Sequence, residues 1–141
     1  LPLPAGGGHR LYLAAMERLV LPALARYRPD AIVVACGFDA AAFDPLGRML
    51  ATAETFREMT RMLMQAAGEL CAGRLVMVHE GGYSEVHVPF CAHAVLEELS
   101  RSAIRAPDPF AETLVLRQPG AEADAFHDAW LDRLAEVHGL T

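Results

Sequence analysis

Apolar residues recur along the chain with two different periods, and these periods predict its secondary structure. Between residues 9 and 28 they lie three or four positions apart, which predicts a helix. The residues on this face are Leu13, Met16, Val20 and Leu24. Because proline cannot donate a backbone hydrogen bond, Pro22 predicts a kink or the start of a second helix within this stretch.

Two short apolar runs predict strands. Residues 31–36 read Ala-Ile-Val-Val-Ala-Cys, and residues 75–78 read Leu-Val-Met-Val. Both runs lack polar alternation and contain β-branched residues, which is typical of strands buried on both faces of a parallel sheet. Turn-forming residues follow each run, at Gly37 and at Gly81-Gly82.

The next helix is predicted to begin at Thr52, whose side chain suits the N-cap position, and to end near Gly73. Glu54 would then face the positive end of the helix dipole. The expected inner face of this helix consists of Phe56, Met59, Leu63, Ala66 and Leu70.

Two more helices are predicted after the second strand, over residues 86–101 and 122–138. The last helix places on one side Phe126, Trp130, Leu134 and Val137. This side is expected to pack either on the same domain or on another subunit. Between the two helices, residues 105–118 carry Pro107 and Pro109 and are expected to be irregular.

The order of helix, strand, helix, strand and helix predicts an α/β fold. We expect a parallel sheet with helices on both faces and a right-handed crossover between the strands. The length of 141 residues fits one domain over residues 1–141. In such sheets ligands bind beyond the carboxyl ends of the strands. The loops at 37–40 and 80–83 directly follow the strands, so we expect them to lie together at that edge.

These two loops carry the residues with the clearest chemical potential. Asp39 follows a buried strand, so its carboxylate would be partly desolvated and would need a cation or hydrogen-bond donors. It is either a metal ligand or a cap for loop N–H groups. Tyr83 follows two glycines and either directs its hydroxyl at reacting atoms or lies at the rim of a site. Asp44 is expected to cap the turn that begins at Pro45, and Glu80 to anchor its loop.

Composition and charge exclude several classes of protein. Hydrophobic residues make up 53% of the chain, which excludes intrinsic disorder. The net charge is −6 and no basic tract occurs, so we expect no nucleic-acid partner. No apolar run is long enough to cross a bilayer and no signal peptide is recognisable, so we expect a cytoplasmic protein with no membrane partner. Three cysteines without a CxxC pair predict reduced thiols rather than a disulfide framework or a cysteine zinc site.

Two segments at the predicted strand ends resemble the histone deacetylase family. Residues 28–40 read Arg-Pro-Asp-Ala-Ile-Val-Val-Ala-Cys-Gly-Phe-Asp-Ala and are followed by Asp-Pro-Leu-Gly at 44–47. They are similar to the third zinc-ligand segment of that family. Residues 78–84 read Val-His-Glu-Gly-Gly-Tyr-Ser and resemble the glycine-rich segment that ends in the catalytic tyrosine. The continuation to residue 91 resembles the bacterial class II branch, the histone deacetylase-like amidohydrolases, and the likeness weakens after about residue 109.

The resemblance implies the C-terminal part of an arginase-like deacetylase fold and zinc-dependent hydrolysis of acetylated amines. By position, Asp39 is similar to an aspartate ligand of the zinc, and Tyr83 to the catalytic tyrosine that stabilises the tetrahedral oxyanion. The resemblance assigns substrate binding to Gly81, Gly82, Leu46 and Phe38. The resemblance implies a small-molecule or peptide acylated amine as substrate. Because lysine-directed relatives carry an apolar residue at the position of Leu46, this residue favours an acyl-lysine-like substrate over an acetylpolyamine, although not all bacterial polyamine enzymes follow that rule.

Two motifs of the family do not occur in this sequence. It contains neither the Asp-x-His pair that binds the zinc nor the His-His pair that acts as general acid and base, both of which lie upstream in the family. We therefore expect the 141 residues alone to be inactive and to bind zinc weakly. The resemblance also implies potassium as a structural ion, whose sites in the family use the same upstream segments. Whether the protein forms a homo-oligomer is left open. The alternative functions are that of a non-catalytic remnant, acting as a binding or assembly module, and that of an acetylpolyamine deacetylase.

Overall fold

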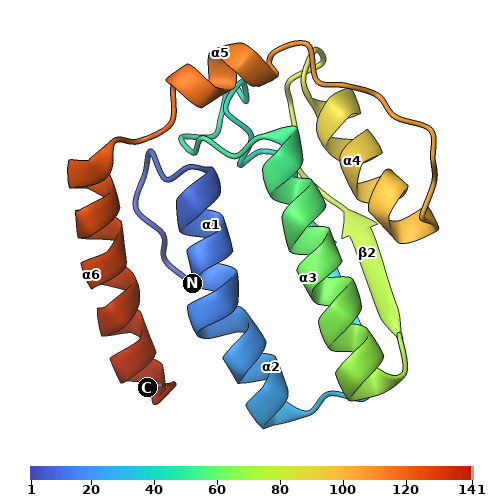
Figure 1. Cartoon of the computed structure of the whole chain (residues 1–141), viewed down its shortest axis with the longest axis vertical. Coiled ribbons are helices and arrows are strands. Elements are labelled where there is room, and N and C mark those ends of the chain that lie inside the picture. Colours follow the sequence, from blue (N-terminus) through green and yellow to red (C-terminus); the bar gives the residue numbers. More distant parts are fainter. Residues whose placement is uncertain (141) are drawn as a thin grey trace.

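The computed structural model describes residues 1–140 as an α/β arrangement in which a small sheet lies behind a row of helices (Figure 1). The elements are α1 (His9–Ala15), the π-helix η1 (Met16–Val20), α2 (Leu21–Tyr27), β1 (Ile32–Cys36), α3 (Ala53–Cys71), β2 (Leu75–His79), α4 (Val88–Ser100), α5 (Ala111–Leu116) and α6 (Ala121–His138). In Figure 1, α1 with α2 forms a column between α6 and α3, and α5 lies across the upper ends of the columns.

β1 and β2 pair in parallel, with Ile32 opposite Leu75 at one end and Cys36 opposite His79 at the other. α3 connects the two strands, as expected for a crossover connection. The parallel arrangement brings the carboxyl ends of both strands to one edge of the sheet. The predicted α/β class and the parallel sheet are therefore confirmed.

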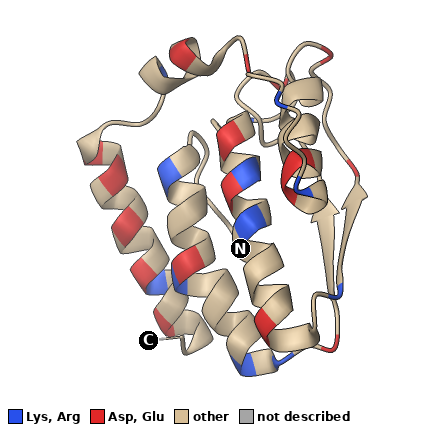
Figure 2. Ribbon diagram, turned by 45° about the vertical axis from the view of Figure 1, so that its right-hand side comes forward, with Lys and Arg blue, Asp and Glu red and all other residues tan. Residues whose placement is uncertain are grey.

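The two faces of the sheet differ in how they are covered. One face packs on α3 through a small buried cluster, which consists of Ile32, Ala67 and Cys71. The other face carries valines that are 70%, 55% and 47% exposed: Val33, Val76 and Val78. Helices were expected on both faces of the sheet. Within residues 1–140 they cover one face, and the valines of the other face are open to solvent. Neither strand carries a charged residue, so the open face is apolar (Figure 2).

The first helical stretch is divided where the sequence predicts a break. α1 passes into the π-helix η1, and α2 begins at Leu21 with Pro22 in its first turn. The backbone stays helical through Val20 and Leu21, and in η1 the N–H of Leu21 donates to the carbonyl of Met16, five residues back. This wider turn accommodates the hydrogen bond that Pro22 cannot donate. Arg28 ends α2 in the left-handed conformation with φ 55°. The predicted interruption near Pro22 is therefore present as a change of helix type within one continuous helical stretch, and not as a separate helix start.

Thr52 caps α3 as predicted. Its hydroxyl accepts a hydrogen bond from the N–H of Thr55 (3.2 Å), and the Thr55 hydroxyl accepts one from the N–H of Thr52 (2.9 Å). This reciprocal pair satisfies backbone donors at the start of the helix. The buried face of α3 includes Phe56, Leu63 and Ala66 from the predicted face, together with Thr60 and Ala67.

α6 packs on α1 and η1 with a face that includes only part of the predicted side. Its buried residues are His127, Leu131, Leu134 and Ala135, and the last three form a cluster with Leu11, Ala15 and Leu19. Of the predicted side, Leu134 packs on this chain, whereas Phe126 is 55% exposed and Val137 is 72% exposed. Whether these two pack on another subunit stays a prediction. Trp130 packs against the edge of the same cluster, and its indole N–H also donates a hydrogen bond to the carbonyl of Pro2 (2.7 Å).

The stretch 105–118 is not irregular throughout, because it contains α5. Asp108 starts this helix: its carboxylate accepts the N–H of Phe110 (2.9 Å), and its carbonyl accepts the N–H of Ala111 (3.2 Å). Pro109 precedes the first turn, where a missing N–H costs nothing. Leu114 then fixes α5 in place by burying its side chain completely.

One buried carboxylate ties α4, and the segment after it, to α3. The Glu97 side chain is 1% exposed and accepts hydrogen bonds from Arg57 of α3, from Arg105 (2.9 Å) and from the N–H of Ala106 (3.0 Å). Burial raises the pKa of Glu97, but these donors outweigh it and lower the pKa to about 2. We call Glu97 and its three donors the Glu97 cluster.

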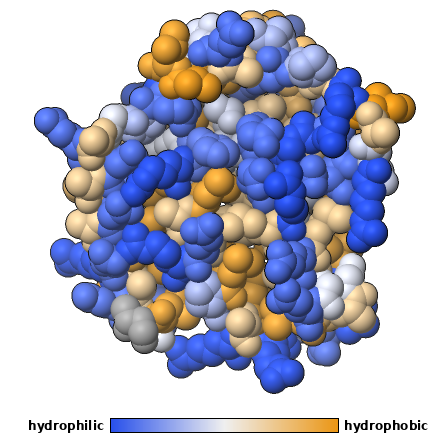
Figure 3. Space-filling view, in the orientation of Figure 1, coloured by the Kyte–Doolittle hydropathy of each residue, from blue (hydrophilic) through white to orange (hydrophobic). Residues whose placement is uncertain are grey.

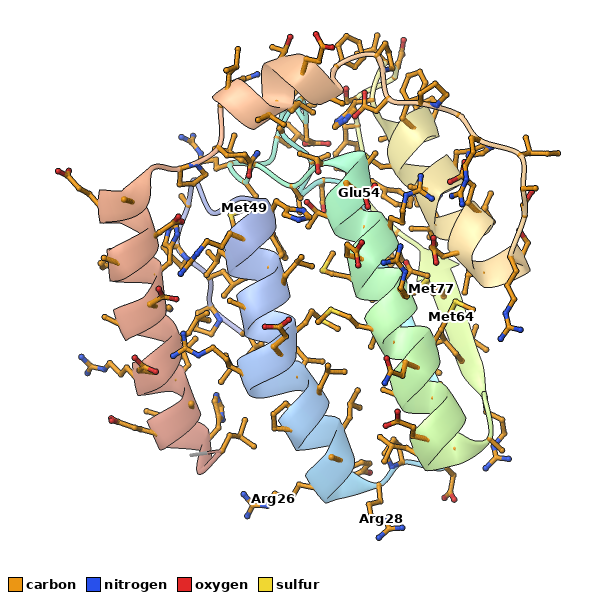
Figure 4. The ribbon with its side chains drawn as sticks, in the orientation of Figure 1. Arg26, Arg28, Met49, Glu54, Met64 and Met77 are labelled. Carbon is orange, nitrogen blue, oxygen red and sulfur yellow. The ribbon has the colours of Figure 1, made fainter. Side chains whose placement is uncertain are left out.

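The surface in the view of Figure 3 is mainly hydrophilic. Hydrophobic atoms show in the seam between α2 and α3, where Leu21, Met62 and Leu70 line a groove. At the lower end of this view Arg28 points away from the body of the molecule (Figure 4), whereas Arg26 donates a hydrogen bond to the carbonyl of Gly139 (3.1 Å) at the end of α6. Within residues 1–140, no helix is long and apolar enough to cross a bilayer.

Candidate functional site at the strand ends

The loops that follow β1 and β2 lie together, as predicted. The N–H of Glu80 donates to the carbonyl of Cys36 (3.3 Å), and the N–H of Phe38 donates to the carbonyl of Gly81 (2.8 Å). These two hydrogen bonds continue the ladder of the sheet into the loops. As a result, Asp39 lies beside the glycine pair.

Close contacts require glycine at positions 81 and 82. A Cβ on Gly81 would lie 2.3 Å from Oδ2 of Asp39, and a Cβ on Gly82 would lie 2.9 Å from Cβ of Phe38. Gly82 also has a φ of 131°, which residues with a side chain rarely adopt. The Asp39 carboxylate therefore lies directly against the backbone of Gly81.

Asp44 joins the two loops. Its Oδ1 accepts the N–H groups of Leu46 (2.9 Å) and Gly47 (2.8 Å), which is the turn cap that the sequence predicts. Its Oδ2 accepts the N–H of Tyr83, from the other loop, at 2.8 Å. Burial raises the pKa of Asp44, but the three backbone donors together outweigh it and hold the pKa below its usual value. Asp44 is therefore a buried anion shared by both loops.

Three of the predicted site residues project from these loops. Asp39 is exposed, Tyr83 is 55% exposed and Leu46 is 71% exposed. The expectation that Asp39 is partly desolvated is therefore not met within residues 1–140. Phe38 points into the core, where it is 4% exposed and its ring lies edge-on to Phe56 with centroids 5.1 Å apart. This position supports the loop from below and leaves the Phe38 ring no direct route to a substrate.

Tyr12 of α1 is a further polar group near Asp39. Burial, and then the negative charge of Asp39, raise the pKa of Tyr12 to about 12. Tyr12 packs against the cluster that contains Phe38. Its phenol is therefore protonated at neutral pH and can donate a hydrogen bond. The sequence pattern does not indicate this residue, because nothing local relates a residue of α1 to a loop after the next strand.

The donor set around Asp39 fits part of a zinc site. Asp39 offers a carboxylate at the carboxyl edge of a parallel sheet, and Gly81 leaves room for it. A catalytic zinc takes three protein ligands. Within residues 1–140, however, no group of three or more His, Cys, Asp or Glu side chains is placed to hold one metal ion. The described chain can therefore contribute one ligand of such a site and not a complete set.

A second cluster, shortly after Tyr83, has the residue types of a catalytic triad but the properties of a packed core. His87 is fully buried and its Nε2 lies 3.0 Å from Oδ2 of Asp108. Sγ of Cys91 lies 3.9 Å and 3.8 Å from the two ring nitrogens of His87, so the sulfur faces the ring rather than either nitrogen. Burial, and then the charge of Asp108, raise the pKa of the Cys91 thiol to about 12. The thiolate that a nucleophile requires is therefore absent at neutral pH.

Comparison with known proteins agrees with this geometry. Residues 1–99 match the family described as the histone deacetylase domain. Over 141 residues the chain is 55% identical to the histone deacetylase-like amidohydrolase of Pseudomonas aeruginosa, covering 99% of this chain and 37% of that protein. It is 40% identical over 124 residues to histone deacetylase 8 of Arabidopsis thaliana, covering 88% of this chain and 32% of that protein. The crystal structure of the HDA15 HD domain is similar with a TM-score of 0.64 and 33% identity, covering 79% of this chain and 30% of that one.

The fold and the two loops define a parallel α/β domain with a candidate site at the carboxyl edge of its sheet. The chain belongs to the histone deacetylase family, and the match over residues 1–99 includes both loops of the candidate site. The similar solved structures are deacetylase domains, which confirms the expected arginase-like deacetylase fold. The chain spans about a third of the length of the curated relatives described above.

Proposed function

We propose that this chain forms part of a zinc-dependent amidohydrolase that removes acetyl or other acyl groups from acyl-lysine or similar acylated amines. The observation that carries this proposal is the meeting of Asp39 and Tyr83 at one edge of the sheet, with Gly81 packed against the carboxylate. The names of the similar proteins, a histone deacetylase-like amidohydrolase and a histone deacetylase, support the same reaction class.

In this proposal each side chain has a separate task. Asp39 is a zinc ligand, together with ligands that residues 1–140 do not supply. When bound, a zinc ion polarises an acyl carbonyl and lowers the pKa of water. Tyr83 donates a hydrogen bond to the carbonyl oxygen as negative charge develops there, and one such donor is worth about 3 kcal/mol in a site that excludes water. Water adds to the acyl carbon, the C–N bond breaks, and the amine leaves with a proton.

Leu46 supports an acyl-lysine-like substrate. Its exposed side chain lies on the loop that Asp44 joins to Tyr83, so it offers an apolar wall at the same edge of the sheet as the phenol. The methylene groups of a lysine side chain can pack against such an apolar surface, and this burial removes them from water. An acetylpolyamine carries further ammonium groups, for which leucine provides no counter-charge. Rates on an acetyl-lysine peptide and on N-acetylputrescine would separate the two substrate classes.

The open face of the sheet supports the proposal that other parts of the protein complete the domain. A row of exposed valines on uncharged strands is unusual at a surface in contact with water. The curated relatives are also much longer than the part that this chain matches. We therefore expect deacetylation by the complete protein and none by the 141 residues alone.

The test is made on the complete protein, by measuring its zinc content and its release of acetate from an acetyl-lysine peptide. D39A is expected to lose both zinc and turnover. Y83F is expected to retain zinc and to turn over about a hundredfold more slowly, because only the hydroxyl is removed. Y27F is the matched control, since Tyr27 is 81% exposed at the end of α2.

Two outcomes would overturn the proposal. The first is a Y83F variant that turns over as fast as the unchanged protein. The second is a folded complete protein that contains no zinc and releases no acetate. This second outcome would favour the non-catalytic remnant.

A further inference from the structure

The connection between the two loops of the site depends on very few atoms. One link is the hydrogen bond between the N–H of Phe38 and the carbonyl of Gly81, at the base of the loops. Farther from the sheet, Asp44 is the side chain that spans them, with its Oδ2 on the N–H of Tyr83 at 2.8 Å. The Tyr83 side chain itself is 55% exposed, so packing restrains it little.

The same carboxylate also determines where Leu46 lies. Oδ1 of Asp44 accepts the N–H groups of Leu46 and Gly47, while Oδ2 accepts that of Tyr83. The residue proposed as the apolar wall and the residue proposed as the oxyanion donor are thus anchored to the two oxygens of one side chain. Because Asp44 is 8% exposed and its acceptors are used by backbone donors, it is itself held in one position.

We infer that Asp44 is a positioning residue, which fixes the Tyr83 phenol relative to the Leu46 wall through the backbone of both loops. This inference rests on the proposed function and goes beyond it, since Asp44 touches neither metal nor substrate. A donor stabilises an oxyanion only when it lies within about 3 Å of the place where the charge forms. A displacement of about 1 Å can reduce a rate about a hundredfold. Releasing the backbone of Tyr83 therefore reduces kcat.

The substitution D44N isolates this link. An amide of the same shape retains one oxygen, and the orientation that places it at Oδ1 preserves both bonds to Leu46 and Gly47. The amide NH₂ then faces the N–H of Tyr83, donor against donor, and the bond between the loops is lost. D44N therefore frees the tyrosine loop while leaving the turn at Pro45 capped.

The experiment measures kcat and KM of the complete protein on an acetyl-lysine peptide for D44N, Y83F and the double variant. We expect D44N to reduce kcat about tenfold or more with KM changed less than about threefold. In the Y83F background D44N should have no further effect, because its influence passes through the phenol. E97Q is the matched control: it also converts a buried, multiply bonded carboxylate to an amide, but between α3 and α4.

A second readout does not depend on activity. In the unchanged protein the amide of Tyr83 should be protected from hydrogen exchange by its bond to Asp44. D44N should accelerate exchange in peptides covering 81–84, and E97Q should not. If D44N does not fold, exchange in the unchanged protein still decides: a Tyr83 amide exchanging at the rate of an unstructured peptide overturns the inference.

The two proposals fail in different ways. If the complete wild-type protein has no deacetylase activity, the proposed function is contradicted. The hydrogen-exchange data then still test the bond between Asp44 and the Tyr83 amide. An active protein in which D44N retains full kcat leaves the proposed function intact and overturns the role of Asp44. The role of Asp44 is also overturned if the kcat losses of D44N and Y83F multiply in the double variant. Such a result would show that D44N affects kcat independently of the Tyr83 phenol.

Discussion

Two buried carboxylates, Asp44 and Glu97, connect different parts of this molecule, and they do so with different donors. Asp44 accepts only backbone N–H groups, two from its own loop and one from the loop of Tyr83. Glu97 accepts one backbone N–H and the guanidinium groups of Arg57 and Arg105. The first carboxylate joins loops at the edge of the sheet, whereas the second joins α3 to α4 and to the segment that follows α4.

Because their donors differ, we expect Asp44 to determine the geometry of the candidate site and Glu97 to contribute to the stability of the fold. A backbone donor cannot move without moving the chain, so Asp44 determines where neighbouring side chains project. An arginine reaches its partner through a flexible side chain, so the Glu97 cluster holds two helices together without defining the position of any group at the site. We therefore expect changes at the loop edge to affect turnover, and changes at the Glu97 cluster to affect folding.

Among changes that keep both Asp39 and Tyr83, the largest effect is expected from G81A, which disturbs the loop edge alone. A Cβ there would lie 2.3 Å from Oδ2 of Asp39, so either the carboxylate or the backbone must move. We expect kcat/KM of the complete protein on an acetyl-lysine peptide to fall about a hundredfold. Zinc content should fall as well, because the displaced group is the proposed ligand.

G68A is the matched control for this prediction. Gly68 lies in α3 with nothing within 4 Å of the position of an added Cβ, so alanine there should stabilise the helix by about 0.5–1 kcal/mol. Turnover should not change in G68A. Unchanged kcat/KM in G81A would show that the contact with Asp39 does not position the carboxylate.

The converse change, E97Q, disturbs the Glu97 cluster alone. The amide cannot neutralise Arg57 and Arg105, and its NH₂ group replaces an acceptor in a side-chain environment that is 1% exposed. We expect the free energy of unfolding to fall by about 2 kcal/mol, measured from urea denaturation, with kcat per folded molecule unchanged. A loss of kcat without a loss of stability would remove the distinction between the two regions.

The same cluster predicts how stability depends on pH. The pKa of Glu97 is lowered from 4.5 to about 2 in the folded chain, so its contribution is fully present above about pH 4.5 and is lost as the pH falls toward 2. The charged or titratable groups that face it are Arg57, Arg105, His93 and, through Arg57, Glu98. In denaturation midpoints between pH 5 and pH 2.5, E97Q should lose less stability than the unchanged protein. Equal losses would contradict the assignment to Glu97.

Local patterns predicted much of the fold because local hydrogen bonds and periodicity determine it. The strands, the break at Pro22 and the cap at Thr52 each depend on neighbouring residues. α5 was not predicted because two prolines suggest a loop, whereas its start depends on the Asp108 carboxylate. The bond from Trp130 to Pro2 could not be predicted, because it joins the two ends of the chain.

The candidate site shows the same limit. That Asp39 and Tyr83 share an edge follows from the topology of parallel strands, which the order of elements predicts. The bond from Tyr83 to Asp44 and the proximity of Tyr12 to Asp39 join residues from separate elements. Such contacts leave no periodic signal in a single sequence. The open valine face could not be predicted either, because an apolar run is the same whether or not a helix covers it.

The smallest effect is expected where charges join helices at the surface. Arg18 of η1 lies 3.2 Å from Asp128 and also pairs with Asp132 on α6, but the three side chains are 31%, 40% and 68% exposed. Since water and salt screen such pairs, R18A should lower the free energy of unfolding by about 0.5 kcal/mol, and less in 1 M NaCl. The measurement is urea denaturation of R18A and of E97Q at low and at high salt. A loss in R18A as large as that in E97Q, or one insensitive to salt, would show that burial of the carboxylate is not what gives the Glu97 cluster its strength.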